Sequence, residues 1–83
     1  MDKIIKFQAS WCEPCKTMSA LLQGEDVGVP IEEIDIDENQ DLAVEYGIRS
    51  VPTLVFVREG MAGDRLIGVK SVAEIREWVK SMM

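Results

Sequence analysis

Strand-like and helix-like segments alternate along this chain, and their order leaves few folds open. Four runs are short, apolar and rich in β-prone residues, which is typical of strands. They are Lys3–Gln8, Ile31–Ile36, Thr53–Arg58 and a run around Arg65–Ile67. The segments that separate them place apolar residues at helical spacing. The chain therefore predicts the order β-α-β-α-β-β-α.

The first two helical segments carry clear start and stop signals. The first begins near Cys12, has Pro14 in its first turn, where a missing N–H costs nothing, and stops at Gly24. Its buried stripe is formed by Cys15, Met18, Ser19 and Leu22. The second follows the capping side chains of residues 37–39 and ends at Gly47. Its apolar face carries Leu42, Ala43 and Tyr46.

The last helical segment begins with a capping box. Ser71 and Glu74 have the spacing at which two side chains satisfy each other's free backbone donors. The helix that follows is expected to bury Val72, Ile75, Val79 and Met82, with Trp78 on or beside that stripe.

The spacing of the segments also predicts strand directions. The first two βα units require crossovers and so favour parallel strands, whereas the last two strands are close enough for an antiparallel hairpin. Glu59–Gly60, together with Gly63, is expected to form the turn of that hairpin. We therefore predict an α/β fold in which a four-stranded mixed sheet has helices on both faces. The 83 residues suffice for a single domain, residues 1–83.

Charge and composition exclude several functions. The chain has 15 acidic and 9 basic residues and a formal charge of −6, which argues against nucleic-acid binding. No apolar run approaches the roughly 20 residues of a membrane span, and Met1–Lys3 leads into a strand rather than a signal peptide. Because the chain has no histidine, Ser-His, Cys-His and His-metal mechanisms are excluded. The chemistry is expected at the two cysteines.

Three interpretations of Cys12 and Cys15 compete. As a structural staple the pair would close a four-residue loop, which contributes only about 2 kcal/mol. A zinc site needs four ligands, usually Cys or His, so we expect no metal here. A redox dithiol is favoured physically, because Cys12 at a helix N-terminus faces free N–H groups that favour its thiolate. Cys12 would be the exposed nucleophile and Cys15 the shielded resolving thiol.

Two motifs give the chain a family resemblance. The segment Trp11-Cys12-Glu13-Pro14-Cys15-Lys16 resembles the thioredoxin active-site motif, W-C-G-P-C-K. Residues Tyr46–Thr53 resemble the segment that contains the family's cis-proline, and Gly68 falls where the family has a glycine near its last strand. The resemblance runs from about Lys3 to Lys80 and implies a thioredoxin-like fold.

The resemblance implies a role for each of these residues. Cys12 would attack a substrate disulfide and Cys15 would resolve the mixed disulfide, with Pro14 between them in the helix start. Pro52 would be cis and lie against the cysteine pair, while the backbone of Val51 pairs with the substrate chain. Trp11, Val51 and Gly68 would border an apolar docking groove.

The same resemblance implies partners. The chain would reduce disulfide-containing proteins and hold no cofactor of its own. A monomer is the expected state, because such a domain must dock many different disulfides. Its electrons would then come from a flavin-dependent reductase of the thioredoxin-reductase type. A cytoplasmic location suits a chain whose only two cysteines form one redox pair.

The chain departs from the family pattern in three places. It starts at the strand that precedes the active site, which is closer to a minimal glutaredoxin-like core. Glu13 replaces a glycine: its charge would either raise the pKa of the thiols slightly or remain a solvated first-turn charge stabilised by the helix dipole. Lys6 stands six residues before Cys12, where the family has a buried aspartate, and Glu33 aligns with the partner lysine.

The exchanged charges at Lys6 and Glu33 allow two interpretations. The side chains could form a partly buried ion pair beneath Cys15, where the ammonium group would favour the Cys15 thiolate. Alternatively, Lys6 could extend to solvent along its aliphatic stem.

Two other functions remain possible. A glutaredoxin-like or ribonucleotide-reductase-specific redoxin suits the chain length, but Glu13-Pro14 stands where glutaredoxins usually carry Pro-Tyr. A non-catalytic binding module could use the surface between Trp11 and Pro52 to hold a partner without turnover. Replacing both cysteines by serine would leave the function of a binding module intact and abolish that of an oxidoreductase.

Overall fold

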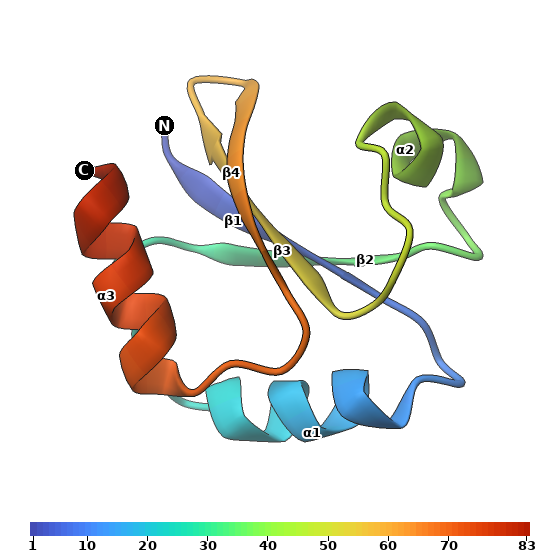
Figure 1. Ribbon diagram of the computed structural model, residues 1–83, viewed down its shortest axis with the longest axis horizontal. Helices are drawn as coiled ribbons and strands as arrows, with labels where there is room; N and C mark the ends of the chain where they lie inside the picture. The colour runs from blue at the N-terminus through green and yellow to red at the C-terminus, as the bar shows by residue number, and fades with distance from the viewer.

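Four strands form one mixed sheet in the order β2-β1-β3-β4, flanked by three helices (Figure 1). The computed structural model describes residues 1–83. The strands are β1 (Lys3–Gln8), β2 (Ile31–Asp35), β3 (Thr53–Arg58) and β4 (Met61–Ile67); the helices are α1 (Glu13–Leu22), α2 (Gln40–Glu45) and α3 (Val72–Met82). The predicted α/β fold and element order are confirmed. None of the helices is long and apolar enough to cross a lipid bilayer.

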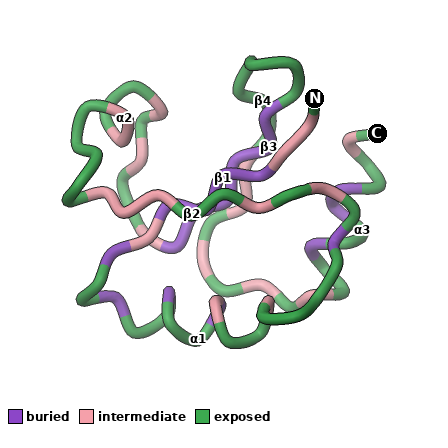
Figure 2. The backbone as a smooth tube through the Cα atoms, turned by 180° about the vertical axis from the view of Figure 1, so that it is seen from behind, coloured by how far each residue is buried: buried purple, intermediate pink, exposed green.

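The two central strands, β1 and β3, carry most of the core, as the purple segments of Figure 2 show. Successive side chains of a strand point to opposite faces. On one face, Ile4 and Phe56 pack against α1 and α3 through Met18, Ile75, Trp78 and Val79. On the other face, Phe7 and Val55 pack against the α2 region through Leu42, Tyr46 and Ile48. Helices therefore cover both faces of the sheet, as predicted.

The prediction of parallel strands is correct for β1 and β2 but wrong for β3. β1 and β2 run parallel with Lys6 opposite Glu33, whereas β3 runs antiparallel to β1 with Thr53 opposite Phe7. The reason is the length of α2. Six helical residues span about 9 Å, less than the roughly 20 Å of a six-residue strand. The chain therefore re-enters the sheet near the end from which it left.

The last hairpin is longer than the sequence suggested. Glu59 and Gly60 form its turn with positive φ angles of 52° and 81°, but Gly63 lies inside β4 and not in the turn. Opposite it, the pairing of β3 with β4 shifts register between Val55 and Val57. A side chain at position 63 would bring its Cβ within 3.2 Å of the Phe56 carbonyl oxygen. The glycine therefore permits a close backbone approach.

The predicted capping box opens α3. The Ser71 N–H donates to the Glu74 carboxylate at 3.1 Å, and the Glu74 N–H donates to the Ser71 hydroxyl oxygen at 3.1 Å. The backbone N–H of Ser71, followed by its hydroxyl, holds the pKa of Glu74 below its ordinary value of 4.5. A carboxyl group with a lowered pKa adds stability above its unfolded-state pKa and loses it as pH falls through the folded value.

We therefore expect Glu74→Ala to lower the urea midpoint of unfolding at pH 7, and the deficit to shrink at pH 3, below the ordinary pKa of 4.5. Glu77→Ala is the matched control, because Glu77 is an exposed residue of the same helix whose carboxylate lies 3.9 Å from Lys80. If Glu74→Ala lowered the urea midpoint equally at both pH values, the ionised Glu74 carboxylate would not be the stabilising group.

Candidate redox site

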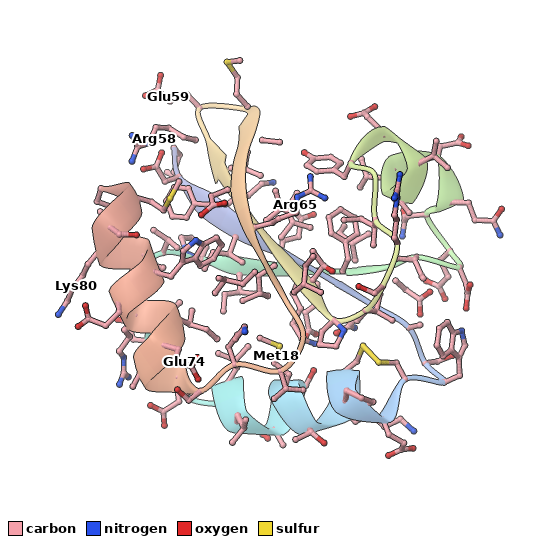
Figure 3. The ribbon with its side chains drawn as sticks, viewed as in Figure 1. Met18, Arg58, Glu59, Arg65, Glu74 and Lys80 are labelled. Atoms are coloured by element: carbon pink, nitrogen blue, oxygen red, sulfur yellow. A yellow bond between two sulfur atoms is a disulfide. The ribbon has the colours of Figure 1, made fainter.

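The two cysteines meet at the start of α1. Cys12 is the N-cap residue, in extended conformation, and Pro14 lies in the first turn. Cys12 and Cys15 form a disulfide with Cα atoms 5.2 Å apart, visible as the yellow bond above α1 in Figure 3. The backbone N–H of Cys15 donates to the Cys12 sulfur at 3.1 Å. This sulfur therefore occupies the position of a capping acceptor, where negative charge is favoured.

The expected exposure of Cys12 is wrong for this disulfide form. Cys12 is only 4% exposed, hardly more than Cys15 at 2%. The two cysteines pack with Ala9, and the partly buried side chains of Ile36 and Val51 lie against them. The bonded sulfur is covered because the chain before β3 passes over it: the Val51 carbonyl oxygen lies 3.7 Å from Cys12 Sγ.

The predicted proline segment lies beside the disulfide. The Val51–Pro52 peptide bond is cis, as the resemblance implied, and Pro52 is buried. The Gly68 N–H donates to the Pro52 carbonyl oxygen at 2.9 Å. Residues from three parts of the sequence, around Cys12, Val51 and Gly68, are thus brought together at one end of the sheet.

Trp11, the residue before Cys12, faces solvent, with 64% of the residue exposed. Its indole N–H donates to the Asp37 carboxylate at 2.8 Å. Asp37 follows β2, and sequence reasoning treated it only as a helix-capping residue. Its place just after a strand parallel to β1 is the signal that could have located it, because the carboxyl ends of parallel neighbours lie at the same edge of the sheet.

Of the two interpretations of Glu13, the structure agrees with a solvated charge in the first helical turn. Its side chain is 81% exposed and lies 3.2 Å from the ammonium group of Lys16, one turn along α1. Exposed pairs of this kind interact weakly, because water and salt screen them. Glu13 is thus a solvated residue of the first helical turn.

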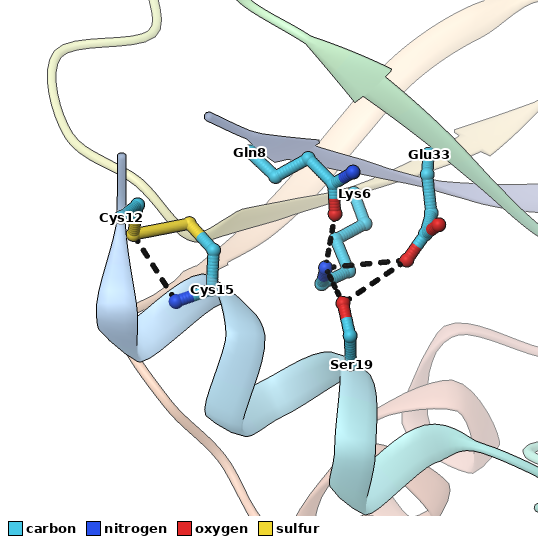
Figure 4. A network of polar contacts seen from close by, with 6 residues as sticks. All are labelled: Lys6, Gln8, Cys12, Cys15, Ser19 and Glu33. Atoms are coloured by element: carbon cyan, nitrogen blue, oxygen red, sulfur yellow. Dashed lines mark hydrogen bonds and ion pairs between the residues drawn. A yellow bond between two sulfur atoms is a disulfide. The ribbon is translucent and has the colours of Figure 1, made fainter. Parts of the chain in front are cut away.

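Lys6 does not extend to solvent. Its side chain is fully buried, 0% exposed, while that of Glu33 is 51% exposed. As Figure 4 shows, Lys6 Nζ donates to the Gln8 side-chain oxygen, to the Ser19 hydroxyl oxygen at 2.6 Å and to the Glu33 carboxylate at 3.3 Å. The Ser19 hydroxyl in turn donates to Glu33 at 3.2 Å.

The ion pair between Lys6 and Glu33 therefore forms. It is part of a hydrogen-bond network with two residues that sequence reasoning did not assign to the site, Gln8 and Ser19. The alternation of β1 could have indicated Gln8, since Lys6 and Gln8 share one face of the strand.

A shallow cavity of about 320 Å³ adjoins both the disulfide and this network. Its lining residues are Gln8, Ala9, Ser10, Cys15, Lys16, Ser19 and Asp35. Cys15 and Ser19 are four residues apart on α1 and therefore lie on the same helix face. The cavity thus gives Cys15 polar neighbours.

The chain is similar to known proteins over nearly its whole length. The family model described as Thioredoxin matches residues 1–81. The chain is 30% identical over 84 residues to mitochondrial thioredoxin from Mus musculus, covering 96% of this chain and 51% of that protein. It is 36% identical over 77 residues to thioredoxin from Bacillus subtilis, covering 88% and 74% of the two chains. The chain thus spans about half the length of the first relatives that it matches.

Solved structures give the same result for the fold. A thioredoxin variant from Halobacterium salinarum superposes with a TM-score of 0.87 at 32% identity, covering 96% of this chain and 73% of that one. A thioredoxin from Nicotiana alata gives a TM-score of 0.84 at 29% identity, with coverage of 96% and 71%.

Proposed function

The chain belongs to the thioredoxin family, and from this premise we propose that it is a thiol–disulfide oxidoreductase that reduces protein disulfides. The observation that carries the proposal is the Cys12–Cys15 disulfide at the N-terminus of α1, with the segment around Pro52 packed against it. The disulfide is the oxidised product of one cycle, and its two-electron reduction restores the dithiol.

In the proposed reaction the Cys12 thiolate attacks one sulfur of a substrate disulfide. The substrate S–S bond breaks, its other sulfur leaves with the electron pair, and a mixed disulfide joins Cys12 to the substrate. The Cys15 thiolate then attacks Cys12 Sγ, so that the second substrate sulfur leaves and the internal disulfide forms. The contact between the Cys15 N–H and Cys12 Sγ supports this order, because the same N–H stabilises a negative Cys12 sulfur.

The substrate is proposed to dock on the surface formed by Trp11, Val51 and Gly68. The exposed indole of Trp11 offers apolar area at the edge of the site. Val51 is partly buried beside Cys12, and its backbone is proposed to pair with an extended segment of the substrate. Pro52 would fix the position of this segment through its bond from Gly68.

The electron donor and the location are part of the same proposal. The chain would receive electrons as a monomer from a flavin-dependent reductase of the thioredoxin-reductase type, because Cys12 and Cys15 hold only two electrons and must be reduced after each cycle. A cytoplasmic location is supported by the chain's having only these two cysteines, a pair that a reducing compartment keeps available as a dithiol.

The test is the reduction of insulin disulfides by dithiothreitol, followed by the turbidity of the released chains. We expect catalytic amounts of the protein to accelerate the reaction. The double variant Cys12→Ser, Cys15→Ser should not, and neither should protein alkylated by iodoacetamide in its reduced form. Reductase function would be contradicted if the wild-type chain left the rate unchanged. If the wild-type chain and the double variant then bound disulfide-containing proteins equally well, the chain would be a binding module.

A further inference from the structure

The buried cation of β1 takes no direct part in the two sulfur attacks of the proposed reaction. Lysine is almost never fully buried unless it is paired, yet the Lys6 side chain is fully buried. The alternation of β1 turns it to the same face as Ile4, under α1, with Phe7 on the opposite face. A buried charge at this position acts on its neighbours with little screening by water.

The hydrogen bonds hold the side-chain nitrogen of Lys6 in place. Its Nζ has three acceptors, the oxygens of Gln8, Ser19 and Glu33. A lysine ammonium group has three N–H donors and no acceptor, so this set of partners matches it fully. No buried side-chain nitrogen or oxygen in the chain lacks a hydrogen-bond partner. The structure is therefore that of a positive charge held in a fixed place.

That charge lies close to Cys15. Ser19, which accepts a hydrogen bond from Lys6 at 2.6 Å, is one helical turn after Cys15 on the same helix face. Both residues line the shallow cavity of about 320 Å³. In Figure 4 the Lys6 ammonium group lies between the disulfide and the Glu33 carboxylate. In that view the cation lies on the disulfide side of its counter-charge.

Other charged groups also lie near Cys15, and the charge of each is expected to act on Cys15 more weakly than that of Lys6. Lys16 and Asp35 line the same cavity. Lys16 is exposed and pairs with the exposed Glu13, so water screens both charges. The Asp35 carboxylate already accepts the backbone N–H groups of residues 37 and 38, at 2.8 and 3.3 Å. Since only Lys6 is wholly removed from water, its charge dominates at Cys15.

We propose that Lys6 is a positioning residue whose ammonium group stabilises the Cys15 thiolate in the step that resolves the mixed disulfide. This inference rests on the proposed reductase function. In that step the Cys15 thiol first gives its proton to solvent in the adjoining cavity. The thiolate electron pair then forms the bond to Cys12 Sγ, the bond from Cys12 to the substrate breaks, and the departing substrate sulfur takes a proton from solvent. Glu33 moderates the cation without cancelling it.

The experiment measures Cys15 alone. In a Cys12→Ser background, the rate of alkylation by iodoacetamide is followed as a function of pH by mass spectrometry. We expect Lys6→Met to move the midpoint of the pH profile upward by about one unit, since an opposite charge nearby is lost. Glu33→Gln should move it downward, because the cation then acts uncompensated. Lys6→Arg should keep the midpoint close to that of the parent.

Opposite shifts distinguish electrostatics from a structural defect, which would move both variants in the same direction. Lys16→Gln is the matched control, because it removes a cation that lines the same cavity but is exposed, and its shift should be less than a third as large. If Lys6→Met fails to fold, the half-exposed Glu33 still provides the downward arm.

A midpoint that is unchanged in both Lys6→Met and Glu33→Gln would overturn the inference, whatever the chain does to insulin. Failure of the reductase function would appear elsewhere, as a wild-type chain that does not accelerate insulin reduction, so the two failures are distinguishable.

Discussion

Cys15→Ser is expected to arrest the exchange as a covalent adduct. When the reduced variant, freed of dithiothreitol, meets insulin, Cys12 attacks a disulfide and no second thiol follows, so the mixed disulfide accumulates nearly stoichiometrically. Multiple turnover should fall by roughly a thousandfold or more, as is common when a reacting group is removed. Mass spectrometry under non-reducing conditions measures the adduct directly.

The reciprocal variant is the control for this result. Cys12→Ser leaves Cys15 as the only thiol, and Cys15 lies inside the first turn of α1, without the N-cap position that favours the Cys12 thiolate. We expect no adduct with insulin from this variant. Equal amounts of adduct from the two variants would show that the roles of nucleophile and resolving thiol are not divided as proposed.

Phe56→Ala is expected to have the largest effect on stability. Phe56 is fully buried in β3, and its ring meets that of Trp78 edge to face with centroids 5.8 Å apart. Loss of a buried Phe side chain costs about 3–5 kcal/mol, because transfer free energy is lost and a cavity remains. A small domain has about 5–15 kcal/mol in all. We expect the melting temperature of the oxidised protein to fall by roughly 15–30 °C.

An exposed leucine gives the matched control. Leu21 is on the outer side of α1 and is 45% exposed, so Leu21→Ala should cost less than about 1 kcal/mol. Denaturant unfolding followed by circular dichroism gives both values. Similar costs for the two variants would mean that the face of the sheet under α1 and α3 is not the main core.

The parts of this structure that depend on local sequence could be predicted. The apolar run of β3, the Ser71–Glu74 capping box and the helix start at Cys12 each follow from residues within a few positions of one another. The burial of Lys6 was one of two predicted outcomes, because the long aliphatic stem of lysine can either remain buried with its ammonium group or carry that group to solvent. Lys6 is buried because Gln8 and Ser19 supply two of the hydrogen-bond acceptors that its ammonium group needs, in addition to Glu33.

Three features that depend on distant segments could not be predicted from local sequence. Cys12 is buried in part against Val51, which is 39 residues away in sequence and whose carbonyl oxygen lies 3.7 Å from the Cys12 sulfur. The direction of β3 depends on how far α2 carries the chain, and Gly63 entered β4 because the register of the hairpin shifts opposite it. Each of these outcomes is decided by packing between elements, which local propensity does not encode.

The two tryptophans of this fold occupy opposite environments, and this divides their optical signals. Trp11 is solvated and sits one residue from the disulfide, whereas Trp78 is 8% exposed and packed edge-on to Phe56. The emission of the first indole should therefore respond to the sulfur chemistry beside it, and that of the second to the integrity of the core. Two variants that each keep one tryptophan, with phenylalanine in place of the other, would record electron transfer and unfolding separately.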